Sequence, residues 1–163
     1  MSAPHASQGF GLLELLVTLL LTSTALLGMI AMQGQAIRHV LAATQQQKAI
    51  FLANDLLEQF AGDPAWMAAH GFAKLPAAAC GSGALQPMAQ RLACWAQAVE
   101  SELPGARALE DQFHLCHSTT PGLCNGGSLL ELQLAWHASG AGCTARGTSG
   151  ARPICHYRLR TAP

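Results

Sequence analysis

The residues of this chain that could do chemistry are six cysteines, seven histidines and nine acidic residues, spread over 163 positions. A structural zinc site would need spacings such as Cys-x-x-Cys or His-x-x-x-His, and neither spacing occurs. The sequence also contains no phosphate-binding loop, nucleophile elbow, paired-carboxylate motif or dinucleotide fingerprint. We therefore expect no enzyme, no metal site and no cofactor.

The charge content excludes two further classes of protein. Charged residues make up 11% of the chain, with nine Lys and Arg balancing nine Asp and Glu, whereas a typical soluble domain has about 25%. Such a chain is neither disordered through charge repulsion nor a highly basic nucleic-acid-binding protein. The apolar residues are also unevenly distributed, because many of them lie near the N-terminus.

An uncharged apolar segment runs from Leu15 to Ile37, between Glu14 and Arg38. About 20 apolar residues in a helix are enough to cross the hydrocarbon layer of a bilayer. A cleaved secretory signal would need a basic N-terminal region and a shorter apolar run, but residues 1–9 contain neither Lys nor Arg. A core helix of a soluble protein rarely runs this long without a charge. The segment therefore predicts a transmembrane helix.

Glu14 lies inside this apolar block, because Phe10 to Leu13 precede it and are also free of charge. An ionised carboxylate costs about 2.5–3.5 kcal/mol at the centre of a membrane helix, and less near the interface. The position of Glu14 has two possible explanations. The acid could lie at the membrane interface, where its carboxylate reaches water, or it could be a functional acid that needs a cationic partner.

The residues around Glu14 resemble a known motif. The run Gly9-Phe10-Gly11-Leu12-Leu13-Glu14-Leu15-Leu16-Val17 is similar to the processing site of type IV prepilins and pseudopilins. The segments 26–36 and 53–58 are similar to those of minor pilins of the PilV kind. The resemblance implies a leader at residues 1–9, cleavage after Gly9, N-methylation of Phe10 and an assembly role for Glu14, the fifth residue of the mature chain.

That resemblance also implies a function and a set of partners. The expected protein is a minor pilin that takes part in pilus assembly, priming the filament or capping its tip. Its partners would be other major and minor pilins, a prepilin peptidase, an inner-membrane assembly platform and, before assembly, membrane lipid. The missing cation for Glu14 would then be the α-amine of Phe10 in a neighbouring subunit, since such a charge pair is strong in a low dielectric.

Two other functions stay open. Within the same class, the chain could be a minor pseudopilin of type II secretion or a DNA-uptake pilin. In a different class, it could be a periplasmic enzyme or binding module on an uncleaved single-span anchor.

We expect an α+β fold in which a long N-terminal helix packs on a small antiparallel-sheet head. Residues 10–36 form the transmembrane half of the helix and residues 37–63 its amphipathic half. The expected apolar stripe of that half is Ile37, Val40, Leu41, Ile50, Phe51, Leu57 and Phe60. Gly62-Asp63-Pro64 would end the helix.

Residues 64–163 are expected to form the head. A helix is expected from about Pro87 to Glu102, because apolar residues recur every three or four positions. Strands are expected over 107–117, over 130–136 and around 155–160, where apolar and polar residues alternate. The segments 118–128 and 138–153 are rich in Gly, Ser, Thr and Pro, which is typical of turns and loops.

All six cysteines follow the apolar segment, on the side expected to be exported. An even number of cysteines in an oxidising compartment indicates disulfides. Composition does not fix their connectivity, and we favour pairs of near neighbours in sequence: Cys80–Cys94, Cys116–Cys124 and Cys143–Cys155.

The C-terminal third of the chain is basic. No acid follows Glu131, whereas four arginines do, at Arg146, Arg152, Arg158 and Arg160. These arginines could form a surface that binds an anion, either an acidic neighbouring subunit or nucleic acid. The alternative is a solvated edge strand, on which cationic side chains discourage unwanted pairing.

Overall fold

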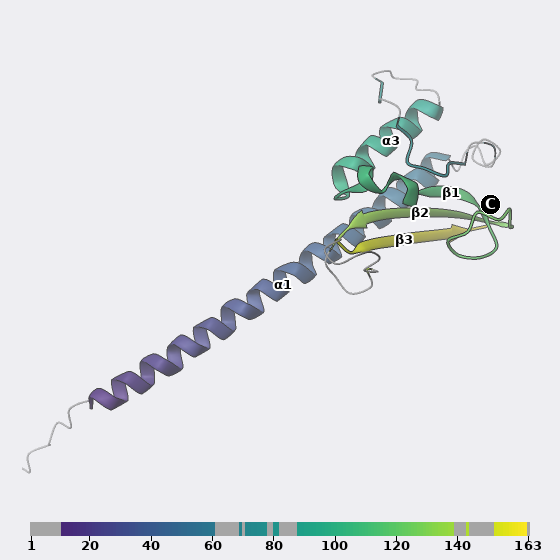
Figure 1. Cartoon of the computed structure of the whole chain (residues 1–163). Helices are drawn as coiled ribbons and strands as arrows, with labels where there is room; N and C mark the ends of the chain where they lie inside the picture. Colours follow the sequence, from purple (N-terminus) through teal and green to yellow (C-terminus); the bar gives the residue numbers. More distant parts are fainter. Residues whose placement is uncertain are drawn as a thin grey trace, which may run out of the picture. The chain divides into compact units, whose positions relative to one another are not determined.

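The described part of the computed structural model comprises residues 11–60, 69, 71–77, 80–81, 88–138, 143 and 152–162. The expected processing residues Gly9 and Phe10, the expected helix end at 62–64, and Arg146 lie outside these residues. The fold is α+β, with a long N-terminal helix α1, a second helix α3, a 3-10 helix η1 and a three-stranded antiparallel sheet (Figure 1). The chain divides into two compact units, Met1–His39 and Val40–Pro163, and α1 crosses the boundary between them.

Helix α1 runs from Leu12 to Phe60 and contains no proline, as the sequence predicts. In the first compact unit every side chain of α1 is exposed. The most apolar 18-residue window of the helix has a mean hydropathy of 2.2 and is also 0% buried. Its hydroxyl groups bond back to the helix: Thr18 donates to the carbonyl of Leu15 and Thr22 to that of Thr18, both at 2.9 Å. The exposed surface of this segment is therefore apolar, and its few polar groups are satisfied within the helix.

In the second unit α1 supplies one wall of the hydrophobic core. The buried residues of this part are Ala49, Leu52, Ala53, Leu56 and Phe60. The expected stripe is therefore wrong in part, because Ile37, Val40, Leu41 and Phe51 are exposed. Alanine side chains occupy much of the buried seam instead. Small side chains allow neighbouring elements to approach the helix closely, and a search for large apolar residues misses them.

Helix α3, from Met88 to Glu102, buries Leu92, Trp95 and Val99 in the same hydrophobic core as the buried residues of α1. The indole Nε1 of Trp95 donates a hydrogen bond of 2.8 Å to the backbone carbonyl of Leu52 in α1. The apolar spacing that predicts this helix also identifies its buried face. One side-chain-to-backbone bond thus joins the two helices inside the core.

The 3-10 helix η1, from Ala106 to Gln112, replaces the first part of the strand expected over 107–117. Gly105 precedes it with a φ of 74°, a left-handed conformation that favours glycine. Leu109 and Phe113 are both buried, and their spacing of four residues suits a helical turn better than an extended strand. Only the part from His114 to Ser118 forms a strand, β1.

The sheet has the order β1-β2-β3, and both pairings are antiparallel. Strand β2 runs from Leu129 to His137 and β3 from Ile154 to Thr161, close to the expected strands. Alternate residues of β2, from Leu130 to Trp136, join α1 and α3 in one core. The opposite face of β2 is also buried and carries Glu131 and Gln133, which are 0% and 6% exposed. The middle strand therefore has an apolar face and a buried polar face.

Three disulfides join Cys80 to Cys94, Cys116 to Cys124 and Cys143 to Cys155. These are the pairs of near neighbours that we favour from the sequence. The first ties the segment before α3 to α3 itself, the second closes a loop after β1, and the third attaches Cys143 to β3. A small α+β head is typically stabilised by about 2–4 kcal/mol for each such bond.

Candidate functional site

Glu14 lies in the first turn of α1, two residues after the helix begins, and is exposed. Its backbone N–H donates to the carbonyl of Gly11 at 3.0 Å. A carboxylate in the first turn is favoured by the partial positive charge at the N-terminal end of a helix. Glu14 has no ion-pair partner in the described part of the chain, and its neighbours on both sides are exposed leucines. It is therefore a carboxylate in an apolar surface without a cation of its own.

The helix that carries Glu14 could span a membrane by its length and composition. Core helices of soluble proteins pass the same test but are mostly buried, whereas the most apolar window of α1 is 0% buried. A signal sequence near the N-terminus also has these properties. The exposure of its large apolar side chains requires another apolar environment, either lipid or the apolar surfaces of other proteins.

A second cluster of charged groups lies on the buried polar face of the sheet. The Oε1 atom of Glu131 in β2 lies 3.0 Å from Nε2 of His114 in β1, and Oε2 lies 3.1 Å from Nε of Arg160 in β3. The same Oε1 accepts a hydrogen bond of 2.6 Å from the backbone N–H of Gly122. One buried carboxylate thus connects all three strands and the loop after β1.

These contacts change the acidity of Glu131. Burial raises the pKa of this carboxyl by disfavouring its charged form, but the hydrogen bonds from His114 and Gly122 and the charges of His114 and Arg160 oppose that effect. The net result is a pKa below the ordinary value of 4.5. Glu131 is therefore ionised at neutral pH, and the neighbouring cation Arg160 partly compensates its burial.

The loop after β1 is held in one conformation by several bonds. The Cys116–Cys124 disulfide closes it, and Asn125 makes two hydrogen bonds of 2.7 Å with Thr119. Arg160 donates to the carbonyl of Thr119 at 2.9 Å. Together with the Glu131–Gly122 bond, these contacts fix residues 116–126, which we call the disulfide loop. Sequence analysis identifies its cysteines but not the bonds that Glu131 and Arg160 make to it.

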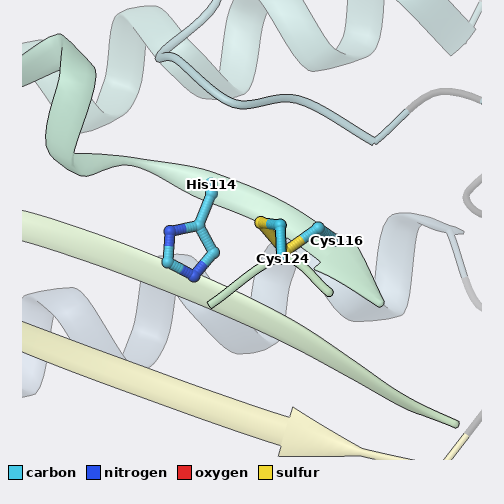
Figure 2. Close-up of side chains that lie close together, drawn as sticks. All are labelled: His114, Cys116 and Cys124. Atoms are coloured by element: carbon cyan, nitrogen blue, oxygen red, sulfur yellow. A yellow bond between two sulfur atoms is a disulfide. The ribbon is translucent and has the colours of Figure 1, made fainter. Parts of the chain in front are cut away.

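Figure 2 shows His114 beside the Cys116–Cys124 disulfide. Their potential ligand atoms lie within 4.8 Å of one another, a distance that suits a metal ion. Both sulfurs are engaged in the disulfide, however, and metals bind cysteine as the thiolate. The Nε2 atom of His114 is also bonded to Glu131. With the disulfide closed, this cluster therefore has a structural role in the loop.

The three described arginines of the expected basic surface, Arg152, Arg158 and Arg160, have different surroundings. Arg158 and Arg160 point to the same face of β3, but Arg160 forms an ion pair with buried Glu131. Arg158 donates from Nε to Oε1 of Gln133 at 2.5 Å and has no acidic partner among the described residues. Arg152 is exposed at the start of this segment. Of the three described arginines, Arg152 and Arg158 thus keep a charge available to a partner.

Glu131 is the charged residue of this cluster that sequence reasoning misses. The sequence does contain a signal, because an acid lies among the leucines of the central strand, and histidine and arginine occur in the neighbouring strands. Only the register shows that Cys116 and Arg160 lie opposite Glu131 and that His114 is two residues away on the same face. Strand register depends on tertiary packing, so composition alone does not place these groups together.

Comparison with known proteins gives no match: no protein-family model, no curated protein and no solved structure matches this chain.

Proposed function

We propose that this protein is a minor subunit of a type IV pilus or of a related secretion or DNA-uptake filament. In this proposal the chain is made as a prepilin, cleaved after Gly9 and held in the inner membrane by α1, with its head in the periplasm. It then enters the filament through packing of its apolar helix. The protein acts through contacts with other subunits rather than through catalysis.

The observation that supports this proposal best is Glu14. It lies near the start of α1, in the long apolar part of the helix whose side chains are all exposed, and has no ion-pair partner among the described residues. A simple membrane anchor has no need for a carboxylate at that place, because the acid makes insertion less favourable. In a filament the α-amine of a neighbouring Phe10 would neutralise the acid and set the axial register between helices.

The head agrees with this assignment. It contains three disulfides, which form and persist in oxidising compartments such as the periplasm. It follows an apolar helix of sufficient length to anchor it. The combination of anchor and disulfide-bonded head also fits an anchored periplasmic module. Two features favour a pilin over such a module: Glu14, and the resemblance of residues 9–17 to a prepilin processing site.

The test is replacement of Glu14 by Ala in the organism that makes the protein. We expect cleavage and membrane insertion to continue, because both depend on the leader and on the apolar helix, while the amount of subunit in sheared filaments falls at least tenfold. Glu58→Ala is the matched control, since Glu58 is an exposed acid in the part of α1 that belongs to the head unit. Normal incorporation of the Glu14→Ala protein contradicts the proposal.

A further inference from the structure

The disulfide loop presents one large apolar side chain to solvent. Leu123 is 58% exposed, and its backbone N–H donates to the carbonyl of Thr120 at 3.1 Å. The surrounding loop is already fixed by a disulfide, by Asn125 and by Glu131. A rigid loop loses little conformational entropy when it binds a partner. An exposed leucine on such a loop therefore has the properties of a preorganised contact residue.

Arg158 lies against Gly122, the residue that precedes Leu123 in the loop. A Cβ atom added to Gly122 would lie only 3.2 Å from an amino nitrogen of the Arg158 guanidinium group, so that group packs directly against the loop backbone. Its Nε is bonded to Gln133, which fixes the side chain, and the residue remains exposed. Leu123 and Arg158 together supply an apolar group and a cation, and we call this pair the loop tip.

The head also contains a groove of complementary character. It lies between α1 and α3 and has a volume of about 500 Å³; its lining residues are Thr44, Gln47, Lys48, Phe51, Leu52, Asp55, Ala98 and Glu102. Phe51 is 71% exposed there. Lys48 and Glu102 pair with each other at 2.5 Å. Asp55 accepts a bond from the Gln59 amide at 2.8 Å but has no cationic partner in the described part of the head.

We propose that the loop tip of one chain docks in the α1–α3 groove of a second copy of this chain. Leu123 would cover the exposed ring of Phe51, and Arg158 would pair with Asp55. Each surface supplies what the other lacks: an apolar contact for an exposed apolar group and an opposite charge for an unpaired charge. The inference uses surfaces of the head alone and does not depend on the function proposed above.

The contact joins two different surfaces, the loop tip and the groove. If both contacts form within one pair, the pair closes as a symmetric dimer; if only one forms, repetition of the contact produces a ring or an open array.

Photocrosslinking tests the contact directly. Leu123 is replaced by benzoylphenylalanine in the full-length chain, which is studied in detergent with micelles in excess so that α1 does not bring chains together. After irradiation, we expect products between chains whose crosslinked peptides map to residues 44–55 or 98–102. Crosslinks that map elsewhere, or the absence of products between chains, overturn the proposal.

Charge reversal in the labelled chain gives the second test. Arg158→Asp and Asp55→Arg should each lower the crosslink yield roughly tenfold, because each places like charges together. An equimolar mixture of the two variants should recover the yield, since every contact between unlike chains again joins opposite charges. Recovery also shows that both variants are folded. Arg152→Asp is the control, because Arg152 is an exposed cation of the same basic region. An unrecovered mixture, or an equal loss with Arg152→Asp, contradicts the docking.

Discussion

The Oε2 atom of Glu131 in β2 lies 3.1 Å from the Nε of Arg160 in β3, and the carboxylate is completely buried. The N–H of Arg160 is not aligned with that oxygen, so the contact is an ion pair rather than a hydrogen bond. The other oxygen contacts His114 and the backbone of Gly122. A single acid therefore holds two neighbouring strands and the disulfide loop against the middle strand.

Replacing Glu131 by Gln tests this role. Glutamine keeps the size of the side chain but removes the charge, and Arg160 then faces a neutral amide. Removal of one partner from a buried ion pair costs about 3–5 kcal/mol. We expect the low end of that range, since the Arg160 side chain is 25% exposed. Urea unfolding of the full chain in detergent, monitored by tryptophan fluorescence, measures the change in the free energy of unfolding.

Glu102→Gln is the matched control for that experiment. Its ion pair with Lys48 joins two side chains that are nearly half exposed, and exposed pairs contribute about 0–1 kcal/mol. Equal losses of stability in the two variants show that the buried cluster has no special role.

The lowered pKa of Glu131 gives the head a defined dependence on pH. The folded-state pKa of this carboxyl lies below its ordinary value of 4.5, so the folded state binds fewer protons there than the unfolded state. The stability that Glu131 contributes is present above pH 4.5 and is lost as the pH falls through the folded-state pKa. We expect the Glu131→Gln protein to lose less stability than the wild type on acidification in this range, measured from urea midpoints. Parallel curves for the two proteins contradict this account.

Two buried tryptophans provide a comparison inside the core. The Nε1 of Trp95 donates to the carbonyl of Leu52, whereas the Nε1 of Trp136 is buried and has no hydrogen-bond partner among the described residues. Both Trp→Phe changes remove similar apolar surface, but only Trp95→Phe breaks a bond. We expect Trp95→Phe to be more destabilising by about 1–2 kcal/mol. Thermal unfolding of both variants measures this difference, and a larger loss at Trp136 refutes the explanation.

The parts of the fold that the sequence predicts are those governed by local pattern. The absence of proline predicts α1, and the spacing of Leu92, Trp95 and Val99 predicts α3. The alternation of apolar and polar residues predicts β2 and β3. The prediction of a strand from residue 107 is wrong, because a 3-10 helix follows Gly105 there. Leu109 lies in this helix and Phe113 directly after it, four residues apart. The two periods are hard to distinguish in a short segment with few apolar residues.

The parts that the sequence does not predict depend on partners distant in the chain. The buried seam of α1 contains Ala49 and Ala53 rather than Phe51, because the neighbouring core, not hydrophobicity alone, selects which face is covered. Glu131 likewise acquires its partners through strand register. For the candidate site, the sequence identifies Glu14 and the loop cysteines, while the connection from β2 to the loop requires the structure.

The N-terminus of the mature protein distinguishes a pilin-type subunit, as proposed, from a protein on an uncleaved anchor. The protein is purified from the membranes of the organism that makes it, and its N-terminal peptide is analysed by mass spectrometry. We expect a chain that begins at Phe10 with a methylated α-amine, because cleavage after Gly9 creates the amine that would pair with Glu14. An intact Met1, or a chain that begins near Gln33 after removal of the apolar segment, contradicts the proposal.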